Sequence, residues 1–403
     1  VLTPAQIATE VEKNYDFLAT NMRNIAMRHR SIRAVFDSSW ALLTEEEQRT
    51  FRRLAVFQGG FRRRAAATVA NATLLTLTNL VNKSLLYEGE THTTDTPAME
   101  DGRYTMHELL KQYAAEKLGD QADERHRMEA RHAAFYTRFL RRQEPRLRGG
   151  QQKEALEAIS QELDNIRQAW KWSVRQLLVE PQAGQQLIDA AASLIIFYET
   201  RGMVIEGREM LQAALDALNG VPSPNGGIAQ KNTYLHALAR IQGGLGLMLY
   251  RMNRFNQGAD YLRESEGILR DLIAVPELDA GTRLEAKRDL ILVLTYLSFA
   301  IARTARQQLG REMILEAIAL SKAIGDRWSL VRATNGLALL TTSFQEQKRL
   351  LKKALRMAQE IGDRILATRI LLNLSGYTNT PEDSFAYAAD IYAIYQEIRN
   401  PAA

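Results

Sequence analysis

Apolar residues recur at intervals of three and four along most of the chain, which is the spacing of amphipathic helices. The stretch 44–57 is an example, because a capping-box pattern at Thr44 precedes apolar residues on one helical face. Gly59–Gly60 ends this helix, and the pattern predicts two more helices, over 64–70 and 74–82. The N-terminal part of the chain therefore consists of short helices joined by brief turns.

Two short runs rich in β-forming residues, Ser84–Tyr87 and Arg103–Met106, follow these helices. A polar stretch rich in Thr, Asp, Glu and Gly separates the two runs. Three helices followed by a β-wing is the order of elements in a winged-helix domain. We therefore expect a winged helix with a small β-wing in this part of the chain.

Beyond Leu118 the pattern is helical throughout, and it becomes repetitive towards the end. The motif Ile-Gly-Asp-Arg ends at Arg327 and again at Arg364, a shift of 37 residues that also aligns Arg332 with Arg369. The segment 245–265 resembles the tetratricopeptide consensus, in which small residues let paired helices approach closely. The fold class that we expect is mainly α, with the winged helix followed by a tetratricopeptide-like superhelix.

Composition limits the kind of protein and the kinds of site. The chain has 403 residues, 46% of them hydrophobic, which predicts two or three domains with packed cores. It has no cysteine, which excludes disulfides and thiolate metal sites, and its six histidines lack metal-ligand spacing. The apolar runs 187–198 and 290–302 are too short to span a bilayer, so we expect no membrane partner and a cytoplasmic location. Because the chain begins at Val1 in what reads as mid-domain sequence, we expect a fragment of a longer protein.

Positive charge is concentrated between Arg125 and Arg148, although the net charge of the chain is only +5. This segment contains eight arginines and two glutamates. Such a cluster is typical of a nucleic-acid contact, of a solvated helix face or of a surface that pairs with an acidic domain. The sequence alone leaves these interpretations open.

Three segments carry a resemblance to a known family. The stretch from Trp40 to Phe61, the segment Leu80–Leu85 and the run Arg103–Leu118 resemble the winged helix of STAND signalling ATPases, which include the NB-ARC proteins. The resemblance covers residues 31–118. It implies four parts: the tail of a helical domain (1–30), the winged helix (31–118), a helical connecting arm (119–181) and a tetratricopeptide-like sensor (182–403).

The same resemblance implies a nucleotide-sensing box at Met106, His107 and Glu108. In the family, the histidine of this box contacts the phosphates of bound ADP. Glu108 stands where the family has Asp, so its role is less clearly implied than that of His107. A neutral imidazole is a good hydrogen-bond donor to a phosphate oxygen, which is consistent with such a role.

The implied function is that of a regulatory and inducer-sensing part of a molecular switch. No Gly-x-x-x-x-Gly-Lys-Ser/Thr motif occurs, so we expect no enzyme activity, no catalytic residue and no cofactor in this chain itself. ADP or ATP, with Mg²⁺, would be bound by a nucleotide-binding core in the longer protein, and that core would be a partner of this chain. We expect the longer protein to oligomerise on activation and this chain to be a monomer.

An unidentified inducer is expected to bind the repeat domain. When Gly246 is placed at the small position of a tetratricopeptide helix, Arg240, Tyr250 and Arg251 face the concave surface, where they suit an anionic or peptide ligand. Two alternatives stay open. The winged helix could bind DNA through Arg62–Arg64, although the family context argues against it, or the repeats could be a passive scaffold for a partner peptide.

Overall fold

The computed structural model describes residues 32–89, 102–177, 184–221, 227–303, 307–377 and 381–399. These residues are mainly helical and include a single small sheet, so the predicted fold class is confirmed. They form two compact units. Unit 1 contains the described residues up to Tyr136 together with Asp164–Ala169, and unit 2 contains Thr137–Leu163 and the described residues from Trp170 onwards. The tail predicted over 1–30 lies outside the described residues.

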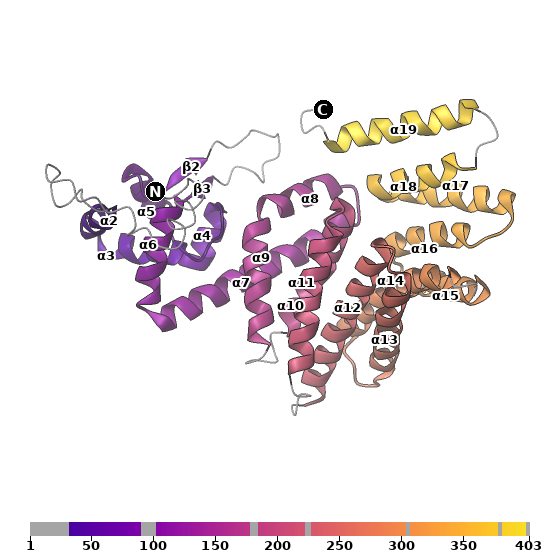
Figure 1. Ribbon diagram of the computed structural model, residues 1–403, viewed down its shortest axis with the longest axis horizontal. Helices are drawn as coiled ribbons and strands as arrows, with labels where there is room; N and C mark the ends of the chain where they lie inside the picture. The colour runs from indigo at the N-terminus through magenta and orange to yellow at the C-terminus, as the bar shows by residue number, and fades with distance from the viewer. Residues whose placement is uncertain are drawn as a thin grey trace, which may run out of the picture. The chain divides into compact units, whose positions relative to one another are not determined.

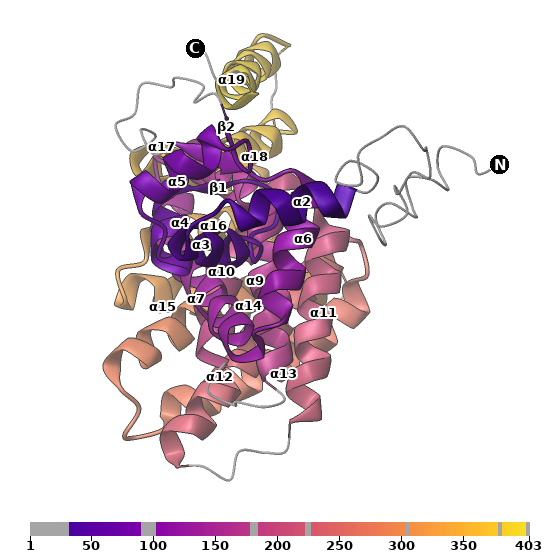
Figure 2. The same cartoon turned by 90° about the vertical axis from the view of Figure 1, so that its left-hand side faces the viewer.

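Unit 1 has the order of elements of a winged helix (Figure 1, Figure 2). In chain order it contains α2 (Ile32–Ala41), α3 (Glu45–Leu54), β1 (Phe61–Arg62), α4 (Arg63–Ala70), α5 (Leu74–Asn82), β2 (Tyr87–Gly89), β3 (Arg103–Thr105), α6 (Glu108–Gly119) and the first part of α7 (Ala122–Leu147). The strands form an antiparallel sheet in the order β1-β3-β2, with Phe61 opposite Tyr104 and Tyr87 opposite Thr105. The predicted helices and the β-wing are therefore present.

The capping box predicted at Thr44 is formed and also connects two helices. The Thr44 hydroxyl accepts from the backbone N–H of Glu47 at 3.3 Å, and the Glu47 carboxylate accepts from the backbone N–H of Thr44 at 2.8 Å. The same carboxylate lies 2.7 Å from Nζ of Lys83, directly after α5. This hydrogen bond lowers the pKa of Glu47, so the start of α3 and the end of α5 are joined by an ion pair.

Part of the predicted connecting arm completes the core of unit 1. Phe57 stacks on Phe61 with ring centroids 4.6 Å apart and meets the buried His132 of α7 edge-on at 5.4 Å. His132 lies 3.2 Å from Oδ1 of Asn165, whose amide donates to the carbonyl oxygen of Gly60 at 2.9 Å. The described part of the segment 119–181, expected as one arm, is thus divided between the two units: the residues up to Tyr136 and Asp164–Ala169 belong to unit 1, and the others belong to unit 2.

Unit 2 is built from helix pairs that follow one another along the chain (Figure 1). After the end of α7 it contains α8 (Gln152–Gln161), α9 (Leu163–Gln176), α10 (Gly184–Arg201), α11 (Val204–Gly220), α12 (Ile228–Arg251), α13 (Phe255–Ala274), α14 (Ala280–Ala302), α15 (Gln307–Ala323), α16 (Arg327–Leu339), α17 (Phe344–Ile361), α18 (Arg364–Ser375) and α19 (Pro381–Arg399). Each helix from α10 to α18 packs on the next, and α12 also packs on α10 and α14, as in helical repeat proteins. None of the described helices combines the length and apolarity that a bilayer crossing requires.

The 37-residue repeat found in the sequence corresponds to a helix-stop, helix-start signal. Gly325 and Gly362 adopt left-handed backbone angles, with φ of 71° and 75°, at the ends of α15 and α17. The following residues, Asp326 and Asp363, cap α16 and α18 by accepting backbone N–H groups at 3.0 and 2.8 Å. The repeat thus preserves the turn between successive helices.

The glycines of α12 allow close helix packing, as the tetratricopeptide comparison predicted. A Cβ on Gly246 would lie 2.6 Å from Cγ of Leu262 and 2.8 Å from the carbonyl oxygen of Gly258, both in α13. These separations leave no room for a methyl group. The Gly-Gly-Leu-Gly segment is therefore a packing element inside a helix, and it is not a phosphate-binding loop.

Candidate functional site

His107 is the N-cap of α6 in unit 1. Its Nδ1 accepts a hydrogen bond from the backbone N–H of Leu109 at 3.3 Å, and the residue is exposed. Because Nδ1 acts as the acceptor, the proton of the neutral imidazole lies on Nε2. The ring therefore presents an N–H donor at the positive end of α6, an arrangement that suits a phosphate oxygen.

The other two residues of the predicted box differ from each other in exposure to solvent. Met106 is half-buried, whereas Glu108 is in the first turn of α6 with 65% of its side chain exposed. The Glu108 carboxylate lies 3.9 Å from Nζ of Lys111, a side chain that is nearly buried and also donates to Gln58. Burial lowers the pKa of Lys111, and the opposing charge of Glu108 partly offsets this. The imidazole of His107 could give one hydrogen bond to a phosphate oxygen here, and the remaining nucleotide contacts would have to come from elsewhere.

Helix α5, the third helix of the winged helix when α3 is counted as the first, carries no charged residue. In DNA-binding members of the fold this helix enters the major groove, where polar side chains read base edges. Here α5 exposes Leu74 and Leu75 by 55% and 71%. The exposed basic residues Arg63 and Arg64 lie on α4. The exposed face of α5 therefore suits contact with a protein better than contact with phosphates.

A buried carboxylate in unit 2 is bound by side chains from four other helices. Glu199 of α10 is 5% exposed, and its partners come from α12, α14, α16 and α18. It accepts from Nε of Arg251 at 3.1 Å, the hydroxyl of Tyr296 at 2.6 Å, Nη2 of Arg332 at 2.9 Å and Nη1 of Arg369 at 2.8 Å. We call these five residues the Glu199 cluster. It connects the first helices of five successive helix pairs.

The Glu199 cluster contains more positive than negative charge. Three guanidinium groups, those of Arg251, Arg332 and Arg369, surround one carboxylate, and among the described residues each of them forms an ion pair with Glu199. Burial by itself would raise the pKa of Glu199, but the three cations outweigh burial and hold that pKa well below 4.5. Glu199 is therefore ionised at neutral pH, and the cluster keeps an excess of positive charge.

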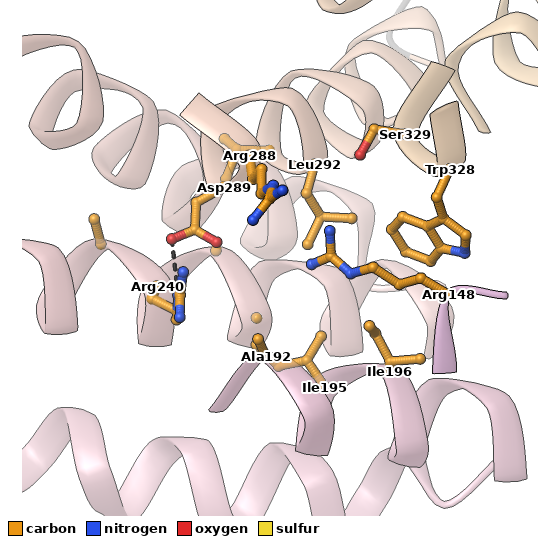
Figure 3. A pocket seen from close by; sticks show the side chains of 14 residues that line it. Arg148, Ala192, Ile195, Ile196, Arg240, Arg288, Asp289, Leu292, Trp328 and Ser329 are labelled. Atoms are coloured by element: carbon orange, nitrogen blue, oxygen red, sulfur yellow. Dashed lines mark hydrogen bonds and ion pairs between the residues drawn. The ribbon is translucent and has the colours of Figure 1, made fainter. Parts of the chain in front are cut away.

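The three predicted sensor residues separate into two groups. Tyr250 and Arg251 lie at the Glu199 cluster, since the Tyr250 ring meets that of Tyr296 edge-on at 5.6 Å. Arg240 lies three turns earlier in α12 and is 5% exposed. Its guanidinium binds Asp289 at 2.8 Å and also pairs with Glu285, as Figure 3 shows for Asp289. Arg240 is thus already engaged within the protein, and ligand binding by all three stays a prediction.

A small pocket in unit 2 lies beside the Glu199 cluster (Figure 3). Arg148 and Arg288 extend into it, and their Nε atoms are buried with no hydrogen-bond partner in the described structure. The inner space of the pocket is about 20 Å³, enough for little more than a water molecule. Trp328 lines it, and the guanidinium groups of Arg148 and Arg332 lie 4.8 and 4.5 Å from the centre of a Trp328 ring. Trp328 therefore connects the pocket with the cluster.

Sequence reasoning missed most of the Glu199 cluster. Arg332 and Arg369 were aligned by the 37-residue shift, which is the signal that two repeats present the same side chain in the same place. Glu199 gave a weaker signal, as an acidic residue directly after a long apolar run. Among the described residues no group of three or more carboxylates and histidines could hold a metal ion.

No family model matches the chain. Proteins of Mycobacterium bovis and Mycobacterium tuberculosis that are HTH-type transcriptional regulators by name are 35% identical to it over 179 residues. The match covers 43% of this chain and 19% of those proteins. The chain therefore matches only about a fifth of the length of these relatives.

Two solved structures are similar in outline. BtubC (BKLC) from P. vanneervenii is 13% identical, with a TM-score of 0.40, over 57% of this chain and 86% of that one. A STAND protein with a tetratricopeptide repeat sensor from Pyrococcus horikoshii is 14% identical, with a TM-score of 0.35, over 98% of this chain and 64% of that one. With TM-scores below 0.5, these likenesses by themselves carry no argument about function.

Proposed function

We propose that this chain is the regulatory and ligand-sensing part of a STAND-type signalling ATPase. In this proposal a nucleotide-binding core elsewhere in a longer cytoplasmic protein holds ADP, and the winged helix closes on that core. The resemblance across residues 31–118 supports the proposal. The single structural observation that carries it is the geometry of His107, an exposed N-cap whose Nε2–H is directed away from its own helix.

His107 would act as a hydrogen-bond donor to a phosphate oxygen, helped by the positive end of α6. The bound nucleotide, with Mg²⁺, would distinguish the closed state of the longer protein from its open state, because ADP and ATP differ by one phosphate. The exposed Leu74 and Leu75 of α5 would add apolar contact with the core. The resting protein would thus be held closed until ADP is released, and the longer protein would then assemble.

The Glu199 cluster is the element through which the repeat unit would sense an inducer. It joins helices up to 170 positions apart in the chain, so a ligand that rearranges it changes the packing of five helix pairs together. Moving a switch from mostly closed to mostly open takes about 5 kcal/mol of differential binding. A buried charge network can supply energy of this size, because removing one partner leaves the other charges buried and unpaired.

DNA binding is the second candidate, and the exposed Arg63 and Arg64 together with the name of the mycobacterial relatives favour it. The uncharged α5 argues against it. The test that separates the two is the nucleotide kept by the longer protein on purification. Loss of ADP on replacing His107 by Asn supports the switch, whereas nucleotide-independent binding of duplex DNA supports the alternative.

A further inference from the structure

We propose that the Glu199 cluster is a binding site for an oxyanion, a carboxylate or a phosphate group of a small ligand, and that Glu199 occupies it as an internal competitor. This inference rests on the proposed function, because it assigns a ligand class to the proposed sensor. The site would consist of the guanidinium groups of Arg251, Arg332 and Arg369 with the hydroxyl of Tyr296. All four converge on the Glu199 carboxylate, which therefore stands where a ligand anion would bind.

The charge balance favours an added anion. Three cations share one carboxylate, and a guanidinium fork is suited to carboxylate and phosphate geometry. One further carboxylate, Asp363, acts on Arg332 through space, and even with it the cations outnumber the anions. Like charges held together out of water raise the free energy of the folded state, and a bound anion relieves this repulsion.

The cluster is also accessible. About a third of the side chains of Arg251 and Arg369 is exposed, 32% and 28%, whereas that of Glu199 is 1% exposed. An anion can therefore reach the outer cations while Glu199 remains in place, and can then compete with it. The neighbouring pocket meets Arg332 through Trp328, but its inner space of about 20 Å³ holds little more than a water molecule and adds no room for the rest of a ligand.

This arrangement predicts opposite effects for two substitutions. Glu199→Gln removes the competing charge but keeps the shape, so anion affinity should rise at least about tenfold, the effect of one charged hydrogen-bonding partner. Arg369→Gln removes one cation from the site, so affinity should fall by a similar factor. Arg349→Gln is the matched control, because Arg349 is exposed in the same unit and pairs with Glu346, away from the Glu199 cluster. It should bind as the wild type does.

The experiment titrates inorganic phosphate and, separately, acetate into the full chain at constant ionic strength, with sodium chloride as the reference salt. Binding is followed by calorimetry and by the unfolding temperature, and the stronger of the two anions identifies the preferred group. Saturable binding that strengthens in Glu199→Gln and weakens in Arg369→Gln supports the site. If neither anion binds saturably, or if both variants bind as Arg349→Gln does, the inference is wrong.

Because Glu199→Gln is expected to be less stable, Arg369→Gln provides the second test in a partly exposed position. Anion should also raise the unfolding temperature of Glu199→Gln more than that of the wild type, since it replaces the lost charge. All of these measurements use the chain without nucleotide. Their failure removes the oxyanion site, whereas the switch itself is decided by the nucleotide experiment on His107.

Discussion

Arg369 of α18 donates from Nη1 to Oε1 of Glu199 in α10 at 2.8 Å, across 170 positions of sequence. The pair joins the first helices of the first and last of the five helix pairs that run from α10 to α19. Repeat proteins usually contact only their neighbours, so a bond of this span makes distant repeats depend on one another. Such dependence is what a sensor needs in order to change as a whole.

Replacing Glu199 by Gln should destabilise unit 2 by about 3 kcal/mol, because the three cations lose their shared carboxylate. Chemical denaturation of the full chain, followed by circular dichroism, measures the change. Glu346→Gln is the control, since Glu346 pairs with Arg349 on the surface and its loss should be almost silent. Equal stability of the two variants would show that the cluster does not hold the repeats together.

His132 should make unit 1 less stable in mild acid. Burial lowers the pKa of His132 from 6.5 to about 4, despite the hydrogen bond with Asn165. Below pH 6.5 the His132 side chain binds a proton in the unfolded chain but stays neutral in the folded chain. The free energy of unfolding therefore decreases as the pH is lowered from 6.5 to about 4. The full loss is about 3 kcal/mol.

His132→Gln tests this pH dependence, because its amide can still donate to Asn165 but does not titrate. The variant should remove the decline of unfolding free energy between pH 6.5 and 5. His126→Gln, at an exposed position on the same helix, should keep that decline. A decline that persists unchanged in His132→Gln would assign the proton uptake to another group.

Two glycines give a matched pair for the packing of α12 on α13. Gly246→Ala should cost about 1–3 kcal/mol, because its methyl group would overlap Leu262 and the Gly258 carbonyl. Gly267→Ala, within α13 and with no atom near its added Cβ, should instead stabilise the helix by about 0.5–1 kcal/mol. Thermal unfolding of the two variants measures the sign of each change in stability. Stabilisation by Gly246→Ala would contradict the close approach of these helices.

Much of the fold could be predicted, because its signals are local. The capping box at Thr44 and the Gly-Asp turns before Arg327 and Arg364 are each formed within a few residues. The site could not be predicted to the same extent. Which face Arg240 presents, and that Glu199 meets Arg369, depend on how successive helix pairs rotate, and no local pattern encodes that rotation.

Duplex DNA should bind this chain weakly and without sequence preference. Because α5 carries no cation and exposes Leu74 and Leu75, it lacks the charged contacts to phosphates on which tight binding depends, so only non-specific affinity, of order 10⁻⁴–10⁻⁶ M at physiological salt, is expected. Fluorescence anisotropy at several salt concentrations measures it. Tight binding that is lost when Arg62–Arg64 are neutralised would favour the DNA-binding alternative.

The most direct test of the central claim is the nucleotide retained by the purified longer protein, wild type beside His107→Asn. Asn is a good N-cap, so this variant keeps the bond to Leu109 and α6 while losing the imidazole Nε2–H. His126→Asn controls for loss of an exposed histidine. The account predicts bound ADP in the wild type and in His126→Asn, and its loss or rapid exchange in His107→Asn. Equal retention of ADP in all three proteins, or none in the wild type, would contradict it.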